Sequence, residues 1–132
     1  MSFEEFLAYS ARLGEIKDVE EMLAVRDPPV DVNFKDESAS SNTALHMASA
    51  NGHTEIVKLL LKVPGIKVSE LNVYKNTPLH YAALNGHVDI VNLLIEAKAD
   101  PNVVNDFDRI PLDEALQSGN TQIADILSEY AP

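Results

Sequence analysis

The sequence contains no cysteine, no tryptophan and no uninterrupted apolar run of the roughly 18 residues that a membrane span requires. Without cysteine, disulfide frameworks, thiolate catalysis and cysteine-based zinc sites are excluded. The first residues, Met-Ser-Phe-Glu-Glu-Phe, lack the basic start and the long apolar stretch of a secretion signal. We therefore expect a cytoplasmic or nuclear protein.

Basic residues are also scarce. Ten lysines and arginines stand against 21 aspartates and glutamates, which gives a net charge of −11. Residues 1–42 carry ten acids and four bases, residues 43–76 carry two acids and four bases, and residues 77–132 are acidic again. This charge opposes direct binding to nucleic acids and to anionic membranes. We expect a monomer that binds another protein through that protein's basic surface.

The most informative feature is a motif that recurs along the chain. Thr-Ala-Leu-His at 43–46 returns as Thr-Pro-Leu-His at 77–80, 34 residues later, and as Ile-Pro-Leu-Asp at 110–113 after a further 33. Glycines at 14, 52, 86 and 119 follow with separations of 38, 34 and 33 residues. In the best copy, Thr77 and Pro78 begin a helix, Gly86 ends it, and an apolar helix follows over 88–95.

Two helices this short are not stable alone in water, so each pair must stack on its neighbours. We place Leu93 in the core of this stack and expect its truncation to alanine to cost about 2–5 kcal/mol. The length of 132 residues and the apolar content of 45 % fit a single domain, 1–132.

The period of 33, with Thr-Pro-Leu-His, Gly-His and Ile-Val-x-Leu-Leu, resembles the ankyrin repeat. The resemblance covers roughly residues 3–130 and implies an all-α solenoid of four stacked helix–turn–helix repeats joined by short β-hairpin loops. The repeats fall approximately at 3–36, 37–72, 73–105 and 106–130. The first copy is degenerate, and its longer spacing requires three extra residues around 27–29 and two in the hairpin around 36–41.

The sequence offers little for catalysis or metal binding. Four histidines occupy two repeat positions, namely His46 and His80, and His53 and His87. A metal site would need three or four converging donors, whereas the resemblance implies that these histidines hydrogen-bond loops of their own and neighbouring repeats. Carboxylates at 113 and 114 are adjacent on a helix and point about 100° apart, so they do not share a substrate. We predict a non-enzymatic protein with no metal and no cofactor.

In ankyrin proteins, partners usually contact the hairpin tips and the outward positions of each first helix. These positions give the predicted partner-binding residues Asp36, Glu37, Met47, Asn51, Tyr74, Lys75, Tyr81, Leu84, Asn85, Phe107, Asp108, Arg109 and Glu114. We expect the three aromatic side chains of this set to face outward, where flanking acids would suit a basic, partly apolar partner. Ser41, Lys75 and Asp108 stand where the family has glycine near the tip, and a left-handed backbone would strain them.

A narrower resemblance rests on residues 35–38, 42–48, 51–53, 84–86, 99–101, 107, 114–115 and 118–119. These segments are similar to a small acidic eukaryotic ankyrin protein, a dedicated chaperone of a basic small-subunit ribosomal protein, which continues into an acidic C-terminal extension that is absent here. The resemblance implies escort of a basic ribosomal protein. The alternative is a regulator that occupies another enzyme such as a protein kinase, because small four-repeat ankyrin proteins include kinase inhibitors.

Overall fold

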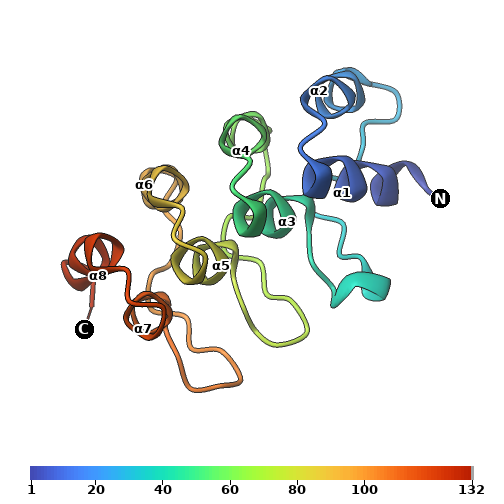
Figure 1. The fold of residues 1–132 in the computed structure, drawn as a ribbon. Helices are drawn as coiled ribbons and strands as arrows, with labels where there is room; N and C mark the ends of the chain where they lie inside the picture. Colours follow the sequence, from blue (N-terminus) through green and yellow to red (C-terminus); the bar gives the residue numbers. More distant parts are fainter. Residues whose placement is uncertain (132) are drawn as a thin grey trace.

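The computed structural model describes residues 1–131, which form four helix pairs joined by long loops. The helices in this range are α1 (Phe3–Leu13), α2 (Ile16–Ala24), α3 (Ala44–Asn51), α4 (Thr54–Leu61), α5 (Pro78–Leu84), α6 (Val88–Glu96), α7 (Pro111–Gln117) and α8 (Thr121–Ser128), with a 3₁₀ turn η1 (Glu37–Ala39). Figure 1 shows α1, α3, α5 and α7 stacked in one row and α2, α4, α6 and α8 in a second. The all-α solenoid of four stacked pairs is therefore confirmed.

The repeat boundaries remain a prediction, and the predicted domain 1–132 ends at a residue outside the described range. None of the helices in residues 1–131 combines the length and apolarity needed to cross a membrane.

Local chemistry explains where the helices begin and end. The Thr77 hydroxyl accepts a hydrogen bond from the His80 N–H at 3.3 Å, and Pro78 occupies the first turn, where no N–H is required. Gly86, at φ +79°, follows α5 in the left-handed region that glycine adopts without strain. These predicted roles are confirmed.

The fourth pair begins differently because Ile110 has no hydroxyl to offer. The Asp113 carboxylate instead accepts a hydrogen bond from the Ile110 N–H at 2.9 Å, which satisfies one donor at the start of α7. Asp113, which stands where the family has histidine, therefore still caps the helix.

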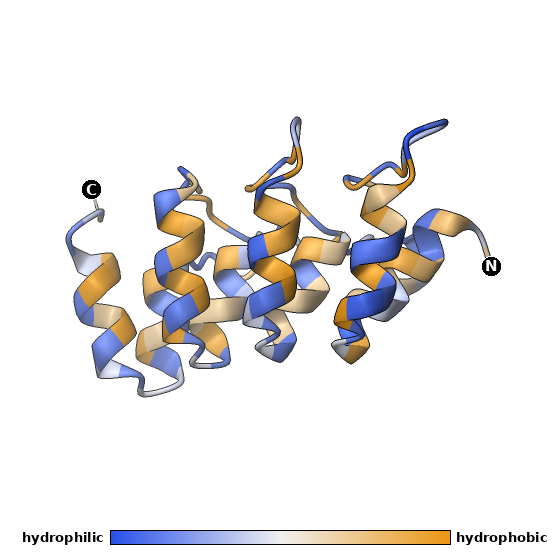
Figure 2. Cartoon of the chain, turned by 90° about the horizontal axis from the view of Figure 1, so that it is seen from above, coloured by the Kyte–Doolittle hydropathy of each residue, from blue (hydrophilic) through white to orange (hydrophobic). Residues whose placement is uncertain are grey.

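A continuous apolar core lies between the two rows of helices. Its largest fully buried side chains include Leu7, Leu45, Ile56, Leu60, Leu79, Ile90, Leu94, Ile123 and Leu127. Figure 2 shows the corresponding pattern, with apolar and polar residues on different faces of the helices. Leu93 is only partly buried, whereas Leu94 is 0 % exposed. The prediction that Leu93 occupies the core was wrong by one residue, a rotation of about 100° around α6.

The loops turn back on themselves but contain no regular strand within residues 1–131. A backbone hydrogen bond of 3.0 Å closes each tip, from Asp36 to Asn42, from Asn72 to Asn76 and from Asn105 to Arg109. We call these segments tip 1 (36–42), tip 2 (72–76) and tip 3 (105–109). Tip 1 is two residues longer than the others and holds η1, so the predicted two-residue extension is confirmed.

Candidate functional site

Two asparagines organise the loop tips. The Asn72 side-chain oxygen accepts hydrogen bonds from the Tyr74 and Asn76 N–H groups at 3.0 and 2.9 Å. Asn105 repeats this arrangement in tip 3, where its oxygen accepts from the N–H groups of residues 107 and 109 at 2.9 and 3.0 Å. The exposed residues of both tips are therefore held in fixed positions.

The tips are also bonded to one another. The Val73 N–H donates to the Ser40 carbonyl, and the Asp106 N–H donates to the Tyr74 carbonyl, both at 3.0 Å. Side-chain amides add a second connection, from Asn72 to Asn42 at 2.9 Å and from Asn105 to Asn76 at 2.7 Å. The three tips thus form one continuous surface along the row of α3, α5 and α7 (Figure 1).

The tips keep the left-handed backbone although they lack glycine. Ser41, Lys75 and Asp108 have φ values of 59°, 60° and 60°. For residues with a Cβ this conformation costs about 1–2 kcal/mol each. The strain expected from the sequence is therefore present.

His46 and His80 form hydrogen bonds to the tips from the first helix of their repeats. The Nε2–H of His46 donates to the Asn76 carbonyl at 2.8 Å, and its Nδ1 accepts from the Thr43 N–H at 3.1 Å. Burial lowers the pKa of His46 to about 4, against the opposing effect of the Asn76 carbonyl. His80 makes the same contacts to tip 3, and burial lowers its pKa too. The structural role expected for these side chains is confirmed.

The second pair of histidines reaches in the opposite direction. His53 Nε2 lies 2.9 Å from the Arg12 carbonyl, and His87 Nε2 lies 3.1 Å from the Ala50 carbonyl, each in the preceding helix pair. Within residues 1–131, no group of three histidine, aspartate or glutamate side chains is placed to hold a metal ion.

Among the predicted site residues, the tip residues are the most exposed. Tyr74 is 45 % exposed and Phe107 is 61 % exposed, and their ring centroids lie 6.3 Å apart. Lys75 pairs with Asp106 at 3.8 Å. Glu37 and Asp108 are exposed on tips 1 and 3. The structure therefore brings two aromatic rings and several charges together on neighbouring tips.

The predicted helix residues make more contacts within the protein than expected. Tyr81 does not face outward freely: it is half-buried, its hydroxyl accepts from Asn72 Nδ2 at 2.7 Å, and its ring packs against His46. Asn51 and Asn85 donate their amides to the carbonyls of Arg12 and Ala50 in preceding pairs at 3.0 and 2.8 Å.

The other predicted helix and tip residues lie near the same face. Met47 and Asp36 are half-buried, and Leu84 is 38 % exposed. The Asp36 carboxylate accepts hydrogen bonds from the Ser38 N–H and hydroxyl at 3.0 and 2.6 Å, which fixes η1.

The prediction that Glu114 is an outward-facing helix position was wrong. Its side chain is 7 % exposed, and Oε1 accepts from Asn105 Nδ2 at 3.4 Å and lies 3.7 Å from Arg109 Nη1. Glu114 follows Asn105 by nine residues, as Tyr81 follows Asn72, so both side chains are acceptors for the asparagine of their own tip. This shared spacing was readable in the sequence.

Sequence reasoning also missed part of the surface. A hollow of about 250 Å³ is lined by Tyr9 and Arg12 of α1 together with Asp36 and Met47. The Arg12 guanidinium lies 5.5 Å from the centre of the Tyr9 ring. Because the first copy of the motif is degenerate, Tyr9 was not recognised as equivalent to Met47 and Tyr81, although each lies five residues before its helix-ending glycine.

Comparison with known proteins matches this architecture to one family. A family model described as ankyrin repeats in three copies matches residues 7–105, and a second, described as ankyrin repeats in many copies, matches residues 86–127. The chain belongs to the ankyrin-repeat family. Ankyrin repeats are scaffolds for protein binding, so this protein is an interaction module.

This ankyrin-repeat protein is also similar to the Ankyrin repeat-containing protein YAR1 of Saccharomyces cerevisiae. The two are 35 % identical over 59 residues, which is 45 % of this chain and 30 % of the yeast protein. The matched stretch is thus less than a third of the length of that relative.

Proposed function

We propose that this ankyrin-repeat protein binds a basic ribosomal protein on its loop tips and escorts it without catalysis. The observation that carries the proposal is the exposed pair Tyr74 and Phe107, whose rings lie 6.3 Å apart on adjacent tips of a chain with net charge −11. Aromatic side chains are the common anchors of protein interfaces, and the tips hold these two in place.

Charge selects the kind of partner. Glu37, Asp106 and Asp108 are exposed on the same row of tips as the aromatic pair, which favours a basic segment with apolar content. A ribosomal protein has such segments, because its natural ligand is RNA. An acidic surface can bind these basic segments and screen their charge. The RNA, which has a higher charge density, can then displace it. The resemblance to an acidic ankyrin chaperone supports this class of partner. We further propose that the protein acts as a monomer in the cytoplasm, the nucleus or both.

The test is affinity purification from the native cell with identification of the captured proteins. We expect a basic ribosomal protein to be enriched with the unaltered chain and lost with Phe107→Ala or Asp108→Lys. Leu116→Ala is the matched control, because Leu116 is 60 % exposed and Phe107 is 61 % exposed, but Leu116 lies on α7 outside the tips. Capture of a protein kinase without ribosomal proteins, with inhibition of that kinase, would favour the regulator instead.

Salt provides a second test with the purified pair. Affinity should fall steeply between low salt and about 0.5 M salt, where the Debye length is only about 4 Å. An affinity that does not change over this range would contradict the electrostatic basis of the proposal.

A further inference from the structure

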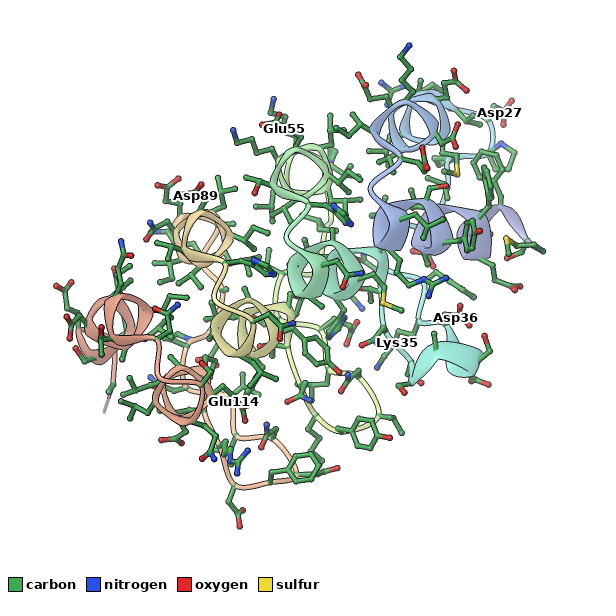
Figure 3. The ribbon with its side chains drawn as sticks, in the orientation of Figure 1. Asp27, Lys35, Asp36, Glu55, Asp89 and Glu114 are labelled. Atoms are coloured by element: carbon green, nitrogen blue, oxygen red, sulfur yellow. The ribbon has the colours of Figure 1, made fainter. Side chains whose placement is uncertain are left out.

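A second hollow lies between tip 3 and the helices beneath it. Its volume is about 220 Å³, and its lining includes Tyr81, Leu84, Phe107, Arg109 and Glu114. Figure 3 places Glu114 on α7 on the side of the loops, whereas the labelled acids Glu55 and Asp89 lie on the outer helices α4 and α6. The hollow therefore combines a carboxylate at its base with aromatic and apolar walls.

The carboxylate in this hollow is buried but loosely paired. Glu114 Oε1 is 3.7 Å from Arg109 Nη1 and 3.4 Å from Asn105 Nδ2. A charge-assisted hydrogen bond between nitrogen and a carboxylate is about 2.7–2.9 Å long, so both contacts are weak. At the equivalent place in the preceding repeat, the Tyr81 hydroxyl accepts a hydrogen bond from Asn72 Nδ2 at 2.7 Å. A buried carboxylate with weak partners gains free energy from a better cation.

The present occupant indicates which cation fits. Arg109 approaches Glu114 with its guanidinium while its side chain stays 40 % exposed, so the hollow is open to solvent at this point. Phe107 lines the same hollow and is 61 % exposed, and an exposed aromatic ring can attract a planar cation. A guanidinium can pair with a carboxylate in a bidentate manner and stack on an aromatic ring, which an ammonium group does less well.

The geometry points to a subsite for an arginine side chain of the partner, in which Arg109 is an internal substitute that the incoming arginine displaces from Glu114. This inference rests on the proposed function, since it specifies how one basic residue of the partner is recognised. Arg109 then competes with the partner's arginine for Glu114, and Glu114 determines the specificity for arginine.

The experiment measures binding of a fluorescent arginine-rich peptide, and of its lysine counterpart with the same net charge, by fluorescence anisotropy at low salt. Arg109→Ala should tighten binding of the arginine peptide by about fivefold, since it leaves the buried carboxylate free. Lys75→Ala is the matched control: it removes the same charge from tip 2 and frees Asp106, an exposed carboxylate. We expect it to tighten binding by about twofold or less, because solvent screens an exposed carboxylate.

Glu114→Gln preserves the shape of the side chain and should cancel the gain produced by Arg109→Ala in the double variant. The lysine peptide should gain less than the arginine peptide from Arg109→Ala. Equal gains from Arg109→Ala and Lys75→Ala, or a gain that survives Glu114→Gln, would overturn the subsite while leaving the proposed function intact. Failure of the unaltered chain to bind either peptide or a basic ribosomal protein would overturn both.

Discussion

At the scale of single residues, Ser49 carries a hydroxyl in the core that no hydrogen-bond partner reaches. The residue is 0 % exposed, and the equivalent position in the next repeat is Ala83, also 0 % exposed. Ser49→Ala should therefore raise the free energy of unfolding by about 1 kcal/mol, because it removes a buried polar group that is unpaired. Urea denaturation measures the change. The reverse exchange, Ala83→Ser, should lower stability by a similar amount, and stabilisation by both exchanges would contradict this account.

The strained tips give a second prediction at this scale. Lys75→Gly and Asp108→Gly should each raise the free energy of unfolding by about 0.5–1 kcal/mol, since glycine adopts the left-handed backbone of these positions without a Cβ penalty. Thermal denaturation of each variant provides the measurement. Val73→Gly is the control, because Val73 lies in the same tip without positive φ and should lose stability. A loss of stability in all three variants would mean that glycine entropy outweighs the strain.

Residue roles were predictable from the sequence where they depend on a few neighbours. Thr77, Pro78 and Gly86 act within one turn of a helix, so their spacing alone identifies them. Tyr81 and Glu114 were misplaced because their environment depends on the loop folding back over the helix. A polar side chain on the outward face of a helix is buried when an asparagine of the loop lies above it.

At the scale of elements, α6 provides the clearest test of helix orientation. Leu94 is 0 % exposed between its neighbours, whereas Leu93 is partly buried at the edge of the core. Leu94→Ala should cost about 2–5 kcal/mol of unfolding free energy, because it leaves a cavity that the stack cannot fill. Leu93→Ala should cost clearly less, on the order of 1 kcal/mol, since part of its side chain already contacts water. Urea denaturation of both variants decides, and equal losses would contradict this orientation of α6.

The existence and order of the helices were predictable because a helix-ending glycine recurs in all four pairs and the Thr-x-Leu-His start recurs in the second and third. The orientation of α6 could also be read from the sequence, because Asp89, Asn92 and Glu96 recur at helical spacing and are all exposed. Leu94 lies on the opposite side of the helix from this polar stripe, whereas Leu93 lies near its edge, so the spacing of the polar residues indicates which leucine is buried.

At the scale of the whole molecule, hydrogen bonds run from each repeat to the next along both edges of the stack. His46 and His80 reach forward to the following tip, while Asn51 and Asn85 reach back to the preceding helix pair. Each repeat therefore depends on its neighbours for buried polar partners as well as for apolar contacts. Such coupling makes unfolding of a short repeat array cooperative.

The forward histidines make this coupling sensitive to pH. Protonation of His46 would place a proton on Nδ1, which accepts from the Thr43 N–H, inside a 0 % exposed site. Its pKa is about 4 in the folded protein and 6.5 as the reference value, so between these values the unfolded chain binds more protons. Stability should thus be full above about pH 7 and fall as the pH decreases, by about 2 kcal/mol at pH 5 from His46 alone. The lowered pKa of His80 acts in the same direction.

Urea denaturation between pH 7.5 and pH 5 measures this loss, and the titration of His46 by NMR identifies its source. His46→Gln is the informative variant, because glutamine at the third helical position can still accept from the N–H of the capping residue but does not titrate. We expect His46→Gln to be less stable at pH 7.5 yet to show a clearly shallower decrease toward pH 5. If the variant and the unaltered protein lose the same free energy over this range, the pH sensitivity originates elsewhere than in the contact between His46 and tip 2.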